Sequence, residues 1–273
     1  IYGECLEATI IIARRNYIRI KCRSTLEIER PKYLDHFNSE TVFERNFFTI
    51  YEMVNNKNYE TIKKIIIYGE EPKENIITEI EYNNNINESQ NKAVSLALGI
   101  QDYLLIQGPP GSGKTTTIGH IVDRLHSENK KIILSCFTHR AIDEIINKIN
   151  EINNTIEIYR IGVNDTESRQ FSNCKILEKE INIEPNTTIE DKITRAQDII
   201  RNSSIFIGTT HAWLSCKYDN IFKNNSFDMA IIDEASQSLI SNTLGVTRLV
   251  KSFILVGDHK QLSPVIKSED AIE

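Results

Sequence analysis

The sequence predicts an α/β fold in which helices cover both faces of a parallel β-sheet. Strand-length apolar runs alternate with helical patterns, a Gly-rich loop joins one run to a helix, and acidic residues end another. The chain has 273 residues, is 40% hydrophobic and 26% charged, and carries a net charge of −6. This composition is near the globular average, which argues against wholesale disorder. No apolar run approaches the roughly 18 residues of a membrane helix, so no membrane partner is expected.

The first part of the chain, residues 1–35, is predicted to form a basic β-unit. Thr9–Ala13 and Tyr17–Cys22 are rich in β-branched and aromatic residues, and Arg14–Asn16 between them is typical of a turn. Residues 1–32 carry seven Lys and Arg against four Glu, although the whole chain is acidic.

The next part, residues 36–82, is predicted to form a helical segment. Apolar residues recur at spacings of three and four between residues 40 and 67. Pro72 ends this pattern, and the Asn-rich segment 83–85 is typical of a connector.

Residues 86–273 are predicted to form the main domain. A helix at about 88–98 ends at Gly99, a favourable C-terminal cap, and another carries an apolar stripe between residues 142 and 149. The charged stretch near 163–200 is expected to be a helical insertion. The predicted buried strands are Tyr103–Ile106, Lys131–Cys136, Ile205–Ile207, Met229–Ile232 and Ser252–Val256.

Cysteine spacing argues against a zinc or iron–sulfur site. The five cysteines form no C-x-x-C pair, and reduced thiols in an intracellular protein are the simplest interpretation. These residues are Cys5, Cys22, Cys136, Cys174 and Cys216.

The strongest chemical signal is the segment GPPGSGKT at residues 108–115, which matches the P-loop pattern G-x-x-x-x-G-K-[ST]. Its flanking strand and helix argue against a chance Gly-rich turn. Glycines let backbone N–H groups converge on phosphates at a helix N-terminus, while Lys114 would reach the β- and γ-phosphates and Thr115 would bind Mg²⁺. The predicted ATP-binding residues are Gln90, Gly108, Pro109, Pro110, Gly111, Ser112, Gly113, Lys114, Thr115 and Thr116.

The second signal is an acid pair, Asp233-Glu234, at the end of the predicted strand Met229–Ile232. In a protein with a P-loop this pattern indicates a Walker B motif. Asp233 would hold Mg²⁺, usually through water, and Glu234 would orient and deprotonate the attacking water. The alternative is that Asp233 caps the following helix.

Two glutamines complete the predicted ATP site. Gln261 follows the last buried strand, at the sheet edge where α/β proteins bind ligands. It would sense the γ-phosphate or the attacking water, and a solvated polar turn is the alternative. Gln90 can pair with an adenine edge, or it can form a capping box with Asn87. Spacing alone leaves both interpretations of Gln90 open.

Taken together, these motifs resemble superfamily I helicases, in the branch that holds the RNA-decay and senataxin-like helicases. Within it, Thr138–Asp143 resembles most closely the DNA replication nuclease-helicases, since RNA-directed relatives more often carry Pro-Ser-Asn at 137–139. The segments that carry the resemblance are Asn87–Gln90, GPPGSGKTT at 108–116, SCFTHRAID at 135–143, GTTHA at 208–212, DEASQ at 233–237 and VGDHKQLSPV at 256–265.

The resemblance implies a RecA-like P-loop NTPase domain preceded by a small β-barrel-like unit and a helical stalk. It also implies that Thr138 and His139 (motif Ia) and Thr209 and Thr210 (motif Ib) contact the sugar–phosphate backbone of a single strand. For Thr209 and Thr210, a polar strand end is the alternative. Trp213, the only tryptophan, would serve as a base-stacking platform or, as its size favours, as part of the core.

The expected function is an ATP-dependent DNA helicase or translocase that uses ATP and Mg²⁺, with Lys114, Asp233, Glu234 and Gln261 as catalytic residues. Single-stranded DNA is favoured over RNA as the partner, and the nucleus is favoured as the compartment. The missing initiator Met and the end soon after Gln261 are expected to mark a fragment that hydrolyses ATP slowly without a second RecA-like domain of the same parent chain. An RNA helicase of the same branch, a non-translocating scaffold and a P-loop kinase or GTPase are the alternatives.

Overall fold

The computed structural model describes residues 8–14, 17–22, 41–55, 59–163, 171–182, 188–214, 222 and 227–261. The chain divides into two compact units, Ile1–Phe43 and Glu44–Glu273, and each is described by itself. Expectations for residues 23–35 and for the motif residues Leu262–Val265 lie outside the described part of the chain.

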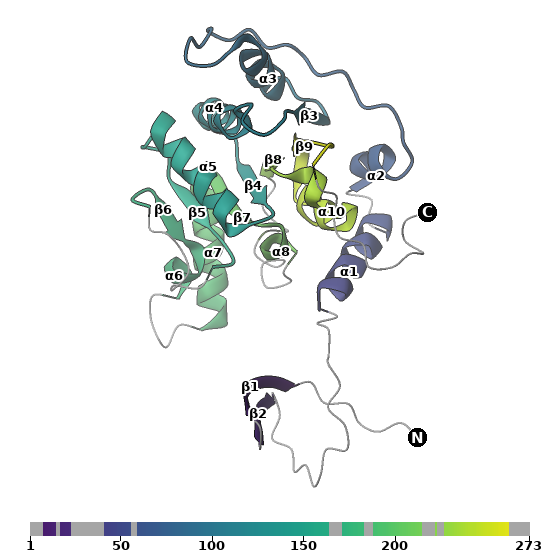
Figure 1. Cartoon of the computed structure of the whole chain (residues 1–273), viewed down its shortest axis with the longest axis vertical. Coiled ribbons are helices and arrows are strands. Elements are labelled where there is room, and N and C mark those ends of the chain that lie inside the picture. The colour runs from purple at the N-terminus through teal and green to yellow at the C-terminus, as the bar shows by residue number, and fades with distance from the viewer. Residues whose placement is uncertain are drawn as a thin grey trace. The chain divides into compact units, whose positions relative to one another are not determined.

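The first unit contains an antiparallel pair, β1 (Ala8–Arg14) and β2 (Tyr17–Cys22) (Figure 1). Its register shifts between Ile10 and Ile12, which marks a bulge in β1. Both predicted strands are therefore confirmed.

The second unit is built on a seven-stranded sheet with the order β3-β9-β8-β4-β7-β5-β6, and every pairing in it is parallel. The five predicted strands are confirmed, while β5 and β6 at one edge were not predicted. The strands are β3 (Tyr103–Gln107), β4 (Ile132–Cys136), β5 (Ile158–Arg160), β6 (Cys174–Ile176), β7 (Ile205–Thr209), β8 (Phe227–Ile232) and β9 (Val250–Gly257).

The two faces of this sheet pack into separate hydrophobic clusters. Alternation along β4 shows this directly, because Ile132 and Leu134 belong to one cluster and Ile133 belongs to the other. The first cluster includes apolar residues of α3 (Glu88–Leu98), α4 (Lys114–Ser127) and α5 (His139–Ile152). The second includes residues of α6 (Leu177–Ile181), α7 (Ile189–Asn202), α8 (Thr210–Trp213) and α10 (Ile240–Thr247). Burial on both faces explains why the strands are continuously apolar, and it confirms the predicted α/β class.

The helices α1 (Thr41–Asn55) and α2 (Glu60–Ile66) account for the helical pattern before residue 67. Met53 and Ile62 pack against Leu244 of α10 in a small third cluster. The guanidinium of Arg248 donates to Glu52 at 2.9 Å and adds a buried ion pair to this contact.

The stretch that we expected to be a helical insertion contains α6 and α7, but it also contains the strand β6. A capping box between Thr188 and Asp191 fixes the start of α7. In the described part of the chain, no helix combines the length and the apolar character needed to cross a bilayer.

Candidate nucleotide and nucleic-acid site

The sheet order brings the predicted motifs together at the carboxyl edge. The P-loop follows β3, the acid pair follows β8, and Gly257 ends β9, which lies between those two strands. The N–H of Gly108 donates to the carbonyl of Gly257 at 3.1 Å, so the P-loop is tied directly to the β9 motif. Segments about 150 residues apart in sequence thus converge, as expected for a parallel sheet.

The P-loop is folded around its own lysine. Lys114 begins α4, and its ammonium donates to the carbonyls of Gly108 at 2.6 Å and Pro109 at 3.1 Å. Gly111 and Gly113 have φ values of +76° and +82°, which L side chains rarely adopt. A positive charge, a helix N-terminus and a glycine loop are therefore assembled where phosphate oxygens can replace the two carbonyls.

Gly113→Ala is expected to weaken nucleotide binding beyond its effect on stability. A Cβ at Gly113 would lie 2.5 Å from Nε2 of Gln90, whereas a Cβ at Gly69, with φ +67°, would meet nothing within 4 Å. Both alanines carry the left-handed backbone penalty of about 1–2 kcal/mol. Gly69→Ala is therefore the matched control in urea unfolding and fluorescent-nucleotide titration. Equal nucleotide affinity in the two variants would contradict the assignment of this loop.

The structure contains the Gln90 capping box. Oδ1 of Asn87 accepts the N–H of Gln90, and Oε1 of Gln90 accepts the N–H of Asn87, both at 2.9 Å. Nε2 of Gln90 also donates to the carbonyl of Gly113 at 3.3 Å, which links α3 to the P-loop. These contacts use one of the two lone pairs and one of the two N–H groups of the amide. The capping-box interpretation is confirmed, and adenine binding by Gln90 stays a prediction.

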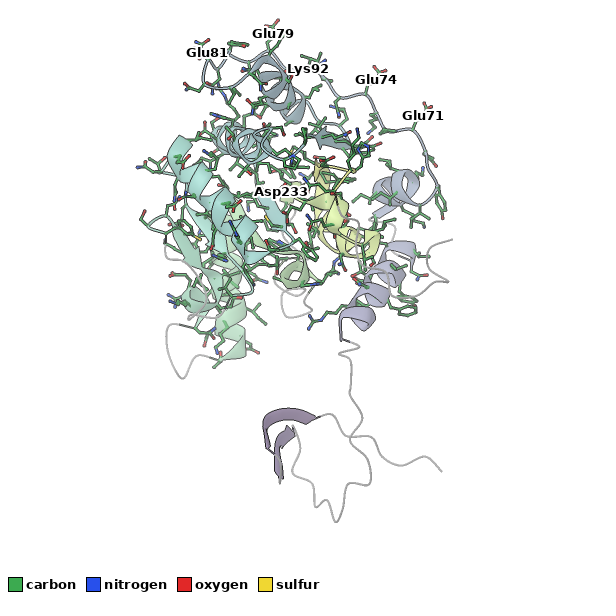
Figure 2. The ribbon with its side chains drawn as sticks, in the orientation of Figure 1. Glu71, Glu74, Glu79, Glu81, Lys92 and Asp233 are labelled. Atoms are coloured by element: carbon green, nitrogen blue, oxygen red, sulfur yellow. The ribbon has the colours of Figure 1, made fainter. Side chains whose placement is uncertain are left out.

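Asp233 and Glu234 lie at the end of β8, and Figure 2 shows Asp233 near the middle of the domain. Asp233 is buried, and its Oδ1 accepts the N–H of Glu234 at 2.9 Å. The short helix η3 (Ala235–Gln237) that follows has no side-chain cap. Asp233 therefore does not act as a helix cap, which removes the alternative to a Walker B role. Burial raises the pKa of Asp233, and the Lys114 ammonium opposes this rise.

Glu234 combines an unusual backbone conformation with a raised pKa. It holds φ +53°, a strained value for a residue with a side chain, and such strain clusters at functional sites. Burial raises its pKa, and the negative charges of Asp233 and Glu144 raise it further. Among the described residues, its buried Oε2 has no hydrogen-bond partner. An oxygen in this condition is available to a water or a metal-bound ligand.

The β9 motif forms a turn that Asp258 organises. Oδ1 of this buried aspartate accepts the N–H of Lys260 at 3.0 Å, and its carbonyl accepts the N–H of Gln261 at 3.0 Å. The turn places the half-buried Gln261 at the same edge as the acid pair. Its proposed contact with phosphate or water stays a prediction.

The two segments expected to contact nucleic acid are neighbours, because β4 and β7 pair with Cys136 opposite Thr209. Thr138 is exposed and caps α5 by accepting the N–H of Ala141 at 3.1 Å, and His139 follows it on the surface.

The side chains of the second segment are used within the fold. Thr209 accepts the N–H of Ala212 at 3.2 Å, and Thr210, 2% exposed, donates to the carbonyl of Cys136 at 3.3 Å. For these side chains, the structure favours a polar strand end.

Aromatic residues near these segments differ in exposure. Trp213 is 1% exposed and donates to the carbonyl of Leu134 at 3.2 Å, which confirms the core role and removes the stacking platform. Phe137, by contrast, is 40% exposed, and the centroid of its ring lies 6.5 Å from the centroid of the His211 ring. Sequence reasoning did not single out this exposed pair.

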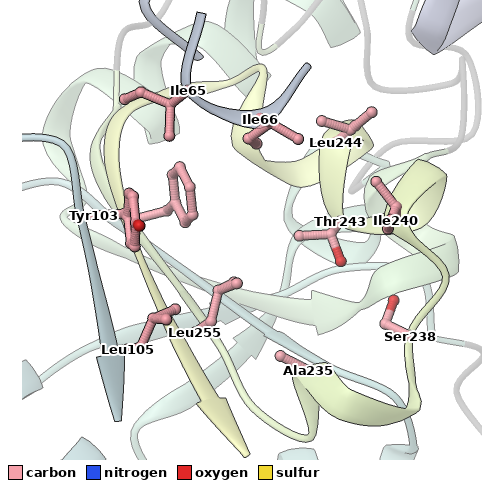
Figure 3. Close-up of a pocket in the computed structure, with 11 residues that line it drawn as sticks. Ile65, Ile66, Tyr103, Leu105, Ala235, Ser238, Ile240, Thr243, Leu244 and Leu255 are labelled. Atoms are coloured by element: carbon pink, nitrogen blue, oxygen red, sulfur yellow. The ribbon is translucent and has the colours of Figure 1, made fainter. Parts of the chain in front are cut away.

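An apolar pocket of about 340 Å³ lies between α2, the β3–β9 edge and α10 (Figure 3). Ile65, Leu105, Leu244 and Leu255 are among its lining residues, and none of the described residues that line it is cationic. A nucleoside triphosphate would find no positive charge among these residues, so this pocket does not fit the nucleotide.

The described residues contain no group of three or more His, Cys, Asp or Glu side chains that could hold a metal ion. A hard cation that keeps waters and binds through one or two carboxylates plus substrate phosphates, as Mg²⁺ does, still fits Asp233 and Thr115.

The sequence of this chain is similar to those of known proteins. The family described as AAA domain matches residues 85–207 and 186–269. The DNA replication ATP-dependent helicase/nuclease dna2 of Schizosaccharomyces pombe is 35% identical over 216 residues, which cover 76% of this chain and 14% of that protein. Its human counterpart is 31% identical over 187 residues, covering 68% and 16%. The chain therefore spans less than a fifth of these relatives.

One similar solved structure is a nuclease-deletion mutant of the Type ISP restriction-modification enzyme LlaGI in complex with a DNA substrate mimic. The matched region covers 68% of this chain and 19% of the LlaGI chain. Its TM-score is 0.47 and its identity is 15%. The relatives named as DNA replication helicase/nucleases confirm the resemblance of the sequence to that group. Because the family match extends over more than half of its residues, the chain belongs to the AAA domain family.

Proposed function

We propose that the second unit is the ATP-binding half of an ATP-dependent helicase or translocase that acts on single-stranded nucleic acid, with DNA favoured over RNA. The convergence of the P-loop, the Asp233-Glu234 pair and the Gln261 turn at one sheet edge carries this proposal. Relatives named as DNA replication ATP-dependent helicase/nucleases support the choice of DNA. A role in DNA replication also favours the nucleus as the compartment.

In the proposed reaction, Lys114 and the P-loop amides bind the β- and γ-phosphates of ATP. Thr115 and Asp233 would hold Mg²⁺, which would supply Lewis-acid stabilisation of phosphate charge when bound. Glu234 accepts a proton from the attacking water at Oε2, which has no hydrogen-bond partner among the residues that the structure describes. Gln261 orients that water, and Gln90 contacts the adenine edge.

The strand β4 provides a path from the ATP site to the nucleic acid. The N–H of Asp233 donates to the carbonyl of Ser135 at 2.8 Å, and β4 then leads through Cys136 to Thr138. A shift of the acid pair during hydrolysis would therefore be passed to motif Ia through one rigid strand. A second RecA-like domain would complete the motor, since arginine fingers supplied by a partner accelerate hydrolysis by about 10³–10⁵-fold.

Glu144→Gln is expected to move the acidic limb of the pH–rate profile to lower pH. Glu234 must be deprotonated to act as a base, and the charge of Glu144 raises the pKa of both Glu234 and Asp233. Removing this charge lowers both pKa values, so activity persists further into acid. Glu144 is 59% exposed, so the displacement should shrink at high ionic strength. Glu151→Gln, on the same helix, is the control, and an unmoved limb in Glu144→Gln would contradict the account.

Oligonucleotide competition tests the proposed polymer. ATP hydrolysis should be stimulated by single-stranded DNA, and matched DNA and RNA strands should compete for this stimulation at a stated salt concentration. Stronger competition by DNA supports the proposal. Preference for RNA would instead indicate an RNA helicase of the same branch, and binding without stimulated hydrolysis would indicate a scaffold.

A further inference from the structure

Arg160 places a buried guanidinium beneath the first turns of α5. The residue ends β5 and is 1% exposed. Ile158, two residues earlier on the same face of the strand, belongs to the cluster that contains the apolar residues of α5. Arg160 therefore faces this helix from below, at the carboxyl edge of the sheet.

The guanidinium spans two residues of α5 that are one turn apart. Its Nη1 donates to Oδ1 of Asp143 at 2.6 Å, and its Nη2 lies 3.4 Å from Nδ1 of His139. Positions 139 and 143 share a helix face, which lets a planar fork reach both. His139 itself is exposed.

This contact selects one form of the imidazole. Arginine has only donors, so Nδ1 of His139 accepts in this contact, and a neutral ring then carries its proton on Nε2. The exposed ring is then left with an Nε2–H donor, which suits an acceptor such as a phosphate oxygen.

Arg160 is enclosed by neighbouring strands of the sheet. β5 lies between two strands, with Arg160 opposite Ile207 of β7 and Ile176 of β6. Burial raises the pKa of the nearby Cys174 thiol to about 11, so this group is neutral at pH 7 and does not compete with Asp143 for the guanidinium. Burying the ion pair between Arg160 and Asp143 costs desolvation energy that an apolar side chain at position 160 would avoid.

We propose that Arg160 is a positioning residue for nucleic-acid binding, because it fixes the orientation and tautomer in which His139 donates from Nε2 to a backbone phosphate. The inference rests on the proposed function. Backbone contacts of this kind set register without reading sequence.

A double-mutant cycle in the full chain tests the inference with a fluorescent oligothymidylate strand. Arg160→Met and His139→Ala should each weaken binding about tenfold, as expected for loss of one charge-assisted hydrogen bond. In the His139→Ala background, Arg160→Met should cause no further loss of affinity for the strand. Arg248→Met removes another buried, ion-paired arginine and should leave the affinity unchanged. If Arg160→Met does not fold, Arg160→Lys, which keeps the charge and loses the fork, takes its place.

The ring tautomer gives a second readout that does not depend on strand binding. ¹⁵N spectra of labelled histidine should show His139 as the Nε2–H form in the parent chain and as a mixture in Arg160→Lys. Equal losses of affinity from Arg160→Met in both backgrounds, or an unchanged tautomer, would overturn the inference. A parent chain with the Nε2–H form that binds no strand would instead overturn the proposed function.

Discussion

Glu234→Gln is expected to reduce ATP hydrolysis by about 10²–10⁴-fold, the usual contribution of a general base. The amide keeps the size of the side chain and cannot accept the proton of the attacking water. Glu234 is suited to this role because its buried Oε2 lacks a partner among the described residues and its pKa is raised by burial and by Asp233. Phosphate release under single-strand stimulation measures the effect.

The same variant should retain ATP binding, since the P-loop contacts are unchanged. Glu151→Gln serves as the control, because this exposed glutamate of α5 pairs with the half-buried Lys148 and not with the acid pair. Hydrolysis in Glu234→Gln at the rate of the parent chain would exclude Glu234 as the base. Loss of binding together with hydrolysis would point to a structural role at its strained backbone position.

Lys114→Ala is expected to weaken ATP binding by about 10- to 100-fold, the effect of losing hydrogen bonds between an ammonium and phosphate oxygens. Hydrolysis should fall to background. In the structure, the ammonium of Lys114 donates to the carbonyls of Gly108 and Pro109, and the substitution leaves both carbonyls without this donor. Fluorescent-nucleotide titration measures the change.

Lys148→Ala is the matched control for this prediction, because it removes a lysine that pairs with Glu151 on α5. Thermal unfolding of both variants separates loss of the fold from loss of the site. Wild-type affinity in a folded Lys114→Ala chain would show that phosphates bind elsewhere.

Five strands of the sheet were predictable because burial on both faces makes parallel strands continuously apolar. β5 and β6 were missed because each has three residues, and each includes a cation, Arg160 or Lys175, where the pattern requires an apolar residue. The ion pair between Arg160 and Asp143 joins strand to helix, so sequence spacing could not reveal it.

Most of the candidate site, like most of the sheet, was predictable from the sequence. Motif spacing placed the P-loop, the acid pair and Gln261 after strands, and parallel pairing then put them at one edge. Spacing could not show that Thr210 is buried, because its environment depends on the register of β7 against β4. Nor could it show that Gln90 bonds to both Asn87 and Gly113, since the second contact depends on how α3 packs against the P-loop.

We expect the carboxyl edge of the sheet to bind ATP with Mg²⁺. Isothermal titration of the full chain with a non-hydrolysable ATP analogue tests it most directly, in the presence and absence of Mg²⁺. One site per chain is expected, with affinity that increases with Mg²⁺ and decreases in both Lys114→Ala and Gly113→Ala. Binding that is absent, or that is unchanged in both variants, would contradict the account.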